Sequence, residues 1–343
     1  MDAASGLPTT TCRAGRAAPS QRLLQVSTVS LEPPHAARQR LLQTSAGTNL
    51  DAFGTAEWGL LAVIATIWGS SFVLMEIGLR AFEPGLITLL RVGLGASALL
   101  LVPRARRTRI AREDWPRVAL LGVVWMGVPL LLFPVAQQWI DSSVAGMING
   151  AMPLTVAAWS VLLLARAPGR SQAIGLVIGF LGIVAISIPE LPVGRLAPEG
   201  TTMSAVGAGL VVLATVLYGL AANIAVPLQQ RYGALPVMLR VQGVALVLIT
   251  PFGLAALPGS RFALGPALAM LPLGVLGTGL AFVLMATLVG RVGGPRGSIA
   301  IYFVPVVAVL LGVVALGEQV HPLAVVGMGL VLAGAWATSR REG

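Results

Sequence analysis

The stretch from Ile299 to Glu318 constrains the fold most, because it has the composition of a membrane-spanning helix that contains a proline. It carries no charge before Glu318, and about 20 apolar residues suffice for a helix to cross the hydrocarbon core of a bilayer. Pro305 within it lies 152 positions after Pro153, which stands inside a second apolar run, residues 145–165. This correspondence suggests that the chain contains two related halves.

The same offset aligns further positions without a gap, and residues 152 positions apart are called equivalent below. The equivalent positions include Leu121-Gly122-Val123 with Leu273-Gly274-Val275, Gly127 with Gly279, Val161 with Val313, Leu164 with Leu316, Gly175 with Gly327 and Gly182 with Gly334. Matched glycines and prolines over about three helices are not expected from shared apolar composition alone. We therefore infer an internal duplication.

The composition indicates a polytopic membrane protein. Of 343 residues, 56% are hydrophobic and 10% charged, and the mean hydropathy is +0.86, which leaves too little polar surface for a soluble fold. The net charge of +10 comes from arginine, since the chain has no lysine. Many of these arginines cluster between apolar runs, as in cytoplasmic loops, so no nucleic-acid partner is expected. The single cysteine, Cys12, leaves no disulfide framework. The two histidines, His35 and His321, lie far apart in sequence, so neither a metal site nor a cofactor is predicted.

Residues 1–55 differ from the rest of the chain. They are rich in Arg, Ser, Thr, Ala and Pro, have few acids and show no sustained periodicity, which predicts a disordered polar tail. An organellar targeting segment and a mis-called start upstream of the true one are the alternatives, and N-terminal sequencing would decide between them.

Ten apolar runs follow the tail. They cover residues 58–79, 84–102, 116–136, 144–165, 172–188, 204–225, 236–257, 266–289, 298–316 and 322–338. The predicted fold is an all-α membrane protein with ten transmembrane helices in two inverted five-helix repeats. The repeats are residues 56–190 and 204–339, with a linker at 191–203 and a C-terminal tail at 340–343.

Arginine placement predicts the orientation. With both termini cytoplasmic, the cytoplasmic side holds Arg104, Arg106, Arg107, Arg109, Arg112, Arg166, Arg170, Arg231, Arg291, Arg296, Arg340 and Arg341, and the opposite side holds Arg80, Arg195 and Arg261. Five helices per repeat is an odd number, so the second copy enters the membrane from the opposite side. The basic loop from Arg104 to Arg112 is expected to contact anionic lipid headgroups.

Several motifs resemble those of the EamA-type carriers in the drug/metabolite transporter superfamily. They are Trp68-Gly69-Ser70-Ser71-Phe72, Pro84 followed by Arg91, the prolines Pro153 and Pro305, and Leu316-Gly317-Glu318. The resemblance covers residues 58–339. It implies ten helices in two inverted repeats, a central cavity lined by both halves, export or exchange of small metabolites, and location in a bacterial plasma (inner) membrane.

Two positions depart from the family pattern. Arg166 stands where the first repeat would match Glu318, and Glu76 stands where members of the family often place a basic residue. Both departures concern the charge of the substrate and the coupling ion rather than the fold.

Three residues of the first helix, Trp68, Phe72 and Glu76, share one face by helical spacing and are candidates to line the cavity. Glu76 has two interpretations: a helical pair with Arg80, or a carboxylate that faces the cavity and responds to protons or cations.

Two arginines inside helices also have alternative roles. Arg91 lies about two turns inside the second helix, where a permanent cation needs a partner or water, and Glu76 is one candidate partner. Arg240 takes a comparable place in the seventh helix. Each is expected either to pair structurally or to bind an anionic substrate group.

The prolines inside helices predict kinks beside the cavity at Pro153 and Pro305. Asn149 and Tyr302 lie about one turn before them and are candidates for substrate hydrogen bonds, with an interhelical hydrogen bond as the alternative. Weaker candidates of the same kind are Gln137, Tyr218 and Asn223. The glycines at positions 175, 179, 182, 327 and 334 are expected to let helices approach closely.

The predicted function is secondary transport of small organic metabolites, amino-acid-like or amphiphilic, by alternating access. The sequence has no ATP-binding motif, so energy would come from a gradient, with protons as the default coupling ion. The alternatives are a non-transporting membrane receptor or scaffold and an intramembrane enzyme, for which the sequence offers no catalytic cluster. The substrate, the direction of transport and the oligomeric state are left open.

Overall fold

The computed structural model of the chain describes residues 51–140, 142–164, 168–187, 201–307 and 321–340, and the regular elements in these ranges are helical. Six helices are long and apolar enough to cross a membrane: Thr55–Leu79, Arg112–Ala136, Met203–Tyr232, Ala234–Ala255, Leu264–Val292 and Pro322–Ser339. Shorter apolar helices cover Pro84–Leu100, Met152–Leu163 and Arg170–Ile186. The protein is therefore an integral membrane protein built from helices, which satisfy their own backbone hydrogen bonds in lipid.

Several predicted features lie outside the described residues. These are the predicted tail before residue 51, linker residues 191–200, and the positions of Arg166 and Glu318. The last three residues of the predicted linker, 201–203, begin a helix.

The first half of the chain forms α2 (Thr55–Leu79), α3 (Pro84–Leu100), α4 (Pro103–Arg107), η1 (Arg112–Asp114), α5 (Trp115–Leu121), η2 (Gly122–Gly127), α6 (Val128–Ala136), α7 (Ser142–Asn149), α8 (Met152–Leu164) and α9 (Arg170–Ser187). The second half forms α10 (Thr201–Tyr232), α11 (Ala234–Ala255), α12 (Leu264–Pro272), η4 (Leu273–Leu280), α13 (Ala281–Val292), α14 (Gly294–Gly297), η5 (Ser298–Tyr302) and α16 (Pro322–Ser339).

Two stretches, η2 and η4, are π-helical and cover equivalent positions. η2 begins at Gly122, and η4 begins at Leu273, one residue before Gly274, the equivalent of Gly122. Each packs its glycine on the other half of the chain. A Cβ on Gly122 would lie 2.5 Å from the Val244 side chain of α11, and one on Gly274 would lie 3.1 Å from the backbone oxygen of Arg91 in α3. Glycine is needed at both places because the neighbouring helix, α11 at Gly122 and α3 at Gly274, leaves no room for a side chain.

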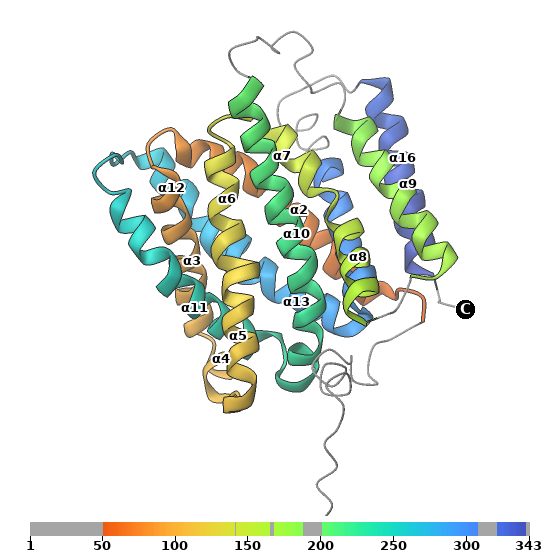
Figure 1. The fold of residues 1–343 in the computed structure, drawn as a ribbon, viewed down its shortest axis with the longest axis horizontal. Helices are drawn as coiled ribbons and strands as arrows, with labels where there is room; N and C mark the ends of the chain where they lie inside the picture. Colours follow the sequence, from red (N-terminus) through yellow and green to blue (C-terminus); the bar gives the residue numbers. More distant parts are fainter. Residues whose placement is uncertain (1–50, 141, 165–167, 188–200, 308–320, 341–343) are drawn as a thin grey trace, which may run out of the picture.

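Equivalent helices pack against each other at the two edges of the bundle. Figure 1 shows α9 beside α16 at one edge, and α3 with α11 at the opposite edge. In the first pair, Gly175 contacts Gly334 and Gly182 contacts Gly327, so α9 and α16 run antiparallel. The prediction that these glycines allow close helix approach is confirmed, because a Cβ on Gly327 would lie 2.6 Å from the Gly182 carbonyl oxygen.

The predicted kinks take a different form. The sequence predicts one kinked helix around Pro153, but two turn residues, Gly150 and Ala151, interrupt the helix between α7 and α8. Pro153 stands in the first turn of α8, where its missing N–H has little consequence. Pro305 follows the 3₁₀ turn η5 by three residues, so here too the irregular backbone precedes the proline. In both cases the irregular backbone precedes the proline, and the kinks themselves stay a prediction.

A buried arginine fastens the two ends of the described chain. Arg296 of α14 donates from Nη2 to the carbonyl oxygens of Asp51 (2.6 Å) and Ser339 (2.9 Å), and its guanidinium lies over the ring of Phe53. The contact with Ser339 places a cation at the C-terminus of α16, where the helix dipole favours it. Arg296 therefore holds the residues before α2 against the end of α16.

The close glycine contact makes a stability prediction. Gly327→Ala should lower the free energy of unfolding by about 1–3 kcal/mol, because the added methyl meets backbone atoms that cannot yield without separating α9 from α16. The control is Gly329→Ala on the same helix, where nothing lies within 4 Å of the added Cβ. Thermal unfolding of both variants in detergent is the measurement. Equal melting temperatures would contradict the predicted backbone contact.

Candidate functional site

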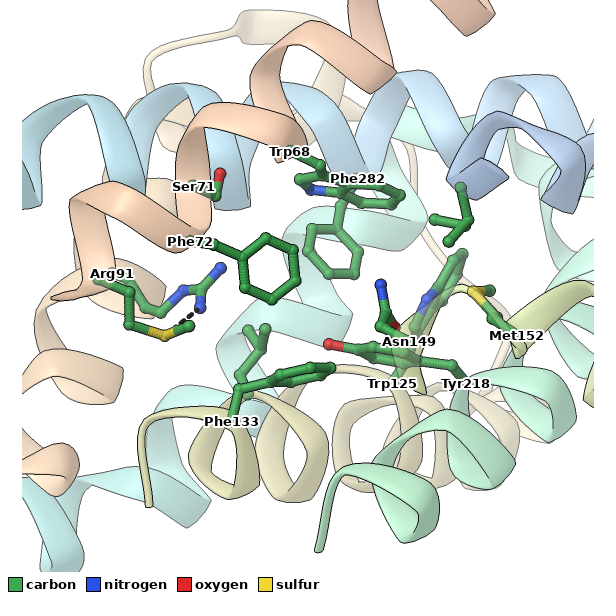
Figure 2. Close-up of a pocket in the computed structure, with 13 residues that line it drawn as sticks. Trp68, Ser71, Phe72, Arg91, Trp125, Phe133, Asn149, Met152, Tyr218 and Phe282 are labelled. Atoms are coloured by element: carbon green, nitrogen blue, oxygen red, sulfur yellow. Dashed lines mark hydrogen bonds between the residues drawn. The ribbon is translucent and has the colours of Figure 1, made fainter. Parts of the chain in front are cut away.

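A pocket lies among the helices of both halves (Figure 2). Its wall is mostly aromatic and apolar and consists of Trp68, Ser71, Phe72, Met75, Arg91, Trp125, Leu130, Phe133, Asn149, Met152, Tyr218, Phe282 and Ile301. A mostly apolar wall with a few polar groups is the kind of lining that small-molecule sites have.

The pocket lies where the two halves meet. Leu130 and Phe282 are equivalent residues, as are Asn149 and Ile301, and all four line the wall. The equivalent positions differ in chemistry, since the first half supplies an amide where the second supplies an alkyl group. The frame is therefore duplicated, whereas the lining is asymmetric.

Aromatic rings form a connected wall. The ring of Phe282 contacts Trp68 edge-on at a centroid distance of 5.1 Å and Trp125 at 6.0 Å, and the ring of Phe133 contacts Phe72 and stacks on Tyr218, both at 6.0 Å. Such pairs each contribute about 0.5–1.5 kcal/mol beyond their burial. They hold an apolar lining of the kind that suits the hydrocarbon part of a ligand.

The π-helix η4 anchors one of these rings. Trp68 of α2 donates its indole N–H to the carbonyl oxygen of Gly277 at 3.0 Å. The broken α-helical pattern of a π turn makes backbone carbonyls available to side chains of other helices, as occurs here. The indole ring is therefore oriented by the opposite half of the chain.

Arg91 of α3 supplies the positive charge of the pocket and is only 5% exposed. Its Nε donates to Thr278 Oγ1 at 3.1 Å and its Nη1 contacts Met75 Sδ at 3.7 Å. Among the described residues, no carboxylate lies within ion-pair distance of Arg91. Its Nη2 makes no hydrogen bond to these residues. A buried cation without a counter-ion is costly in a membrane helix, so this geometry favours an anionic ligand group over structural pairing.

Arg240 behaves differently. Its guanidinium donates to the backbone carbonyl oxygens of Ala105, of Arg106 at 3.1 Å and of Thr108 at 2.9 Å. These carbonyls stand at and beyond the end of the short helix α4, so Arg240 holds the loop between α3 and α5. This arrangement supports the structural alternative for Arg240.

Two uncharged polar groups reach the pocket from other helices (Figure 2). Asn149 is the last residue of α7, just before the turn that separates α7 from α8. Its buried Oδ1 has no hydrogen-bond partner among the described residues. Tyr218 of α10 stacks on Phe133, and its hydroxyl makes no hydrogen bond to the part of the chain that is described. Buried polar groups are normally paired, so these two are available to a ligand.

Trp68, Phe72, Arg91, Asn149 and Tyr218 are thus the predicted site residues that the structure brings together. The other four predicted residues do not line the pocket.

Two of those four form interhelical hydrogen bonds. The Tyr302 hydroxyl donates to the carbonyl oxygen of Leu176 in α9 at 2.7 Å, and the Asn223 amide donates to Val156 of α8 at 2.9 Å. Both contacts correspond to the packing alternative.

The remaining two predicted residues lie on helices that contribute other side chains to the wall. Gln137 follows α6, and its buried amide atoms have no partner among the described residues. Glu76 is exposed on α2. Its suggested pairing with Arg91 is not among the contacts of Arg91, which go to Thr278 and Met75.

Sequence reasoning missed several pocket residues: Ser71, Met75, Trp125, Leu130, Phe133, Met152, Phe282 and Ile301. The repeat alignment could have found one of them, because Ile301 is equivalent to the predicted Asn149.

The EamA-like transporter family model matches this chain twice, at residues 57–188 and 205–340. The chain belongs to the EamA-like transporter family. It is therefore a membrane transport protein, and the family indicates a transporter rather than an enzyme.

Curated relatives agree with this assignment. An uncharacterized transporter of Archaeoglobus fulgidus is 26% identical over 290 residues, covering 83% of this chain and 99% of the relative. A probable terminal-alkyne amino-acid exporter of Streptantibioticus cattleyicolor is also 26% identical, covering 83% and 94%. A probable amino-acid metabolite efflux pump of Salmonella typhimurium is 25% identical, covering 80% and 92%.

A solved structure supports the fold alone. A chain described only as the crystal structure of a protein superposes with a TM-score of 0.65 at 20% identity, covering 83% of this chain and 96% of that one.

The two roles considered for Arg91 predict opposite effects on stability. If its charge serves a ligand, Arg91→Met should leave the melting temperature of the ligand-free protein unchanged or raise it, because an unpaired buried cation destabilises a membrane helix by about 2.5–3.5 kcal/mol. The control is Arg296→Met, which removes hydrogen bonds to two carbonyl oxygens and should lower the melting temperature. A clear loss of stability in Arg91→Met would indicate a structural role.

Proposed function

We propose that this transporter is a secondary carrier for small amphiphilic metabolites that bear a carboxylate, with amino-acid-like compounds as the leading class. The observation that carries the proposal is the buried guanidinium of Arg91, which faces an aromatic pocket and has no carboxylate partner among the described residues. A substrate carboxylate would supply the missing counter-charge. Charge-assisted hydrogen bonds of this kind are the strong ones.

The rest of the wall supports an amphiphilic substrate. The unpaired Asn149 Oδ1 and the Tyr218 hydroxyl can accept hydrogen bonds from an ammonium or hydroxyl group. Aromatic rings between them and Arg91 suit an apolar side chain (Figure 2). Two relatives at 25–26% identity carry names that refer to amino acids or their metabolites, which favours the same class.

The proposed architecture is ten transmembrane helices in two inverted five-helix repeats, residues 56–190 and 204–339, with both termini cytoplasmic. The antiparallel packing of α9 on its equivalent α16 supports inversion, because equivalent helices of parallel repeats would point the same way. The reciprocal contacts of η2 with α11 and of η4 with α3 support an axis between the halves. The bias of arginines toward one side supports the orientation.

Alternating access requires that either end of the bundle can open. At one end of α3, buried Asp114 binds Arg231 Nη1 at 2.7 Å, the Tyr232 hydroxyl at 2.6 Å and Arg117 at 3.0 Å, which joins η1 and α5 to the end of α10. At the other end, the backbone N–H of Glu83 donates to Ser260 Oγ at 2.9 Å. In the proposed cycle the Asp114 contacts at one end and the Glu83–Ser260 hydrogen bond at the other close the pocket alternately.

Counterflow into liposomes tests the proposal. Purified protein reconstituted with an internal amino acid should accumulate the same labelled amino acid for at least one member of a panel of aliphatic and aromatic amino acids. Arg91→Gln should weaken apparent affinity by about 10- to 100-fold, since a hydrogen bond to a charged group contributes about 1.5–3 kcal/mol. Ligand binding without exchange would instead support a receptor, and exchange that ignores Arg91 would place the carboxylate elsewhere.

Proton coupling is proposed through Glu76, the exposed carboxylate of α2. Glu76→Gln should retain counterflow but lose its stimulation by an imposed proton gradient, because an amide cannot carry a proton at neutral pH. Glu83→Gln, at the N-terminus of α3, is the control. Transport in matched liposomes with and without the gradient is the measurement. An unchanged response in Glu76→Gln would remove this residue from the coupling mechanism.

A further inference from the structure

We propose that Thr278 is a positioning residue for substrate recognition, which holds the guanidinium of Arg91 toward the pocket from the opposite half of the chain. The inference rests on the proposed function, because it assumes that Arg91 binds the substrate carboxylate. It adds that the anion site is assembled from both repeats.

The hydrogen bonds around Thr278 fix its role as an acceptor. Its hydroxyl donates to the carbonyl oxygen of Leu273 at 3.1 Å and thereby uses its only proton. The remaining lone pair accepts from Arg91 Nε at 3.1 Å. The Thr278 carbonyl oxygen in turn accepts from the amide of Gln242 in α11 at 2.9 Å. The side chains of Arg91, Gln242 and Thr278 are all buried, so water does not compete for these contacts.

The π-helix explains why the hydroxyl reaches α3. Thr215, Thr250 and Thr287, which stand in regular helices, each donate to the carbonyl four residues earlier. Thr278 instead donates to the carbonyl five residues earlier, which the wider π turn brings within reach. Gly274 at the start of the same turn brings η4 against the Arg91 backbone. The turn and the glycine together place one hydroxyl against one guanidinium.

The duplicated frame carries this arrangement once. The equivalent of Thr278 is Met126 in η2, and the equivalent of Arg91 is Gly243 in α11. Neither can form the bond, since Met126 has no hydroxyl and Gly243 no side chain. The asymmetry argues against a role in packing common to both halves, because the equivalent π-helix forms without it.

The part of the Arg91 guanidinium that makes no contact with the described residues can bind the substrate. Nε is held by Thr278 and Nη1 lies against Met75, so Nη2 is the nitrogen without a protein partner among the described residues. Figure 2 shows the Arg91 side chain entering the pocket beside Phe72. Without the threonine hydroxyl, the Arg91 side chain can rotate, and carboxylate binding would then be weakened by the entropy cost of ordering that side chain.

The test compares binding of carboxylates and their amides by titration calorimetry on the purified full chain. The probes are benzoate with benzamide and L-phenylalanine with L-phenylalaninamide. The variants are Thr278→Val, which removes the hydroxyl at nearly constant volume, Thr278→Ser, which keeps it, and Arg91→Gln. Thr250→Val is the matched control, because that hydroxyl bonds only within its own helix.

We expect Thr278→Val to weaken carboxylate binding about ten-fold, the scale of one hydrogen bond to a charged group, and to leave amide binding unchanged. Thr278→Ser should restore the wild-type affinity, and Thr250→Val should match it. Equal loss for carboxylates and amides, or no loss at all while Arg91→Gln abolishes the carboxylate preference, would overturn the role of Thr278 alone. Absence of any carboxylate preference in the wild-type protein, or its persistence in Arg91→Gln, would overturn the proposed anion site as well.

Discussion

The absence of water in the hydrocarbon core of a bilayer is the constraint on which this structure depends. Every backbone N–H and C=O group there needs a partner within the protein, so the chain forms helices and departs from the α-helical pattern only where other groups take over. The departures are informative. Two of them, η2 and η4, lie at equivalent positions, and the break after Asn149 lies at the pocket. Irregular backbone and the candidate site therefore occur together.

Helix association in lipid lacks a strong hydrophobic driving force, so close backbone contact has to replace it. The glycines of α9 and α16 provide this contact at one edge of the bundle, and Gly122 and Gly274 provide it between each π-helix and the opposite half. These contacts are reciprocal between the halves and define a nearly symmetric frame. The pocket lies on the boundary of that frame and inherits contributions from both sides.

The proposed function requires that the two halves of the pocket lining differ in chemistry. Asn149 and its equivalent Ile301 both line the pocket but differ in polarity. Arg91 and Thr278 have the equivalents Gly243 and Met126, which carry no matching groups. The anion site that we propose is thus single within a duplicated scaffold. An amphiphilic substrate needs this polarity, because a pocket with equal ends would not distinguish its carboxylate from its apolar side.

The sequence by itself determined the membrane environment, the duplication and the glycine contacts between helices, because hydropathy and spacing are local or periodic properties. It also named five residues of the pocket wall. Only the tertiary structure decided which polar groups face the pocket. Asn149 and Tyr302 each lie about one turn before a proline, yet Asn149 lines the pocket whereas the Tyr302 hydroxyl donates to the carbonyl oxygen of Leu176 in α9. Thr278 was missed because a π turn rotates the helix face by about one residue. The rotation of a helix about its own axis is set by its neighbours, and spacing along the chain does not contain it.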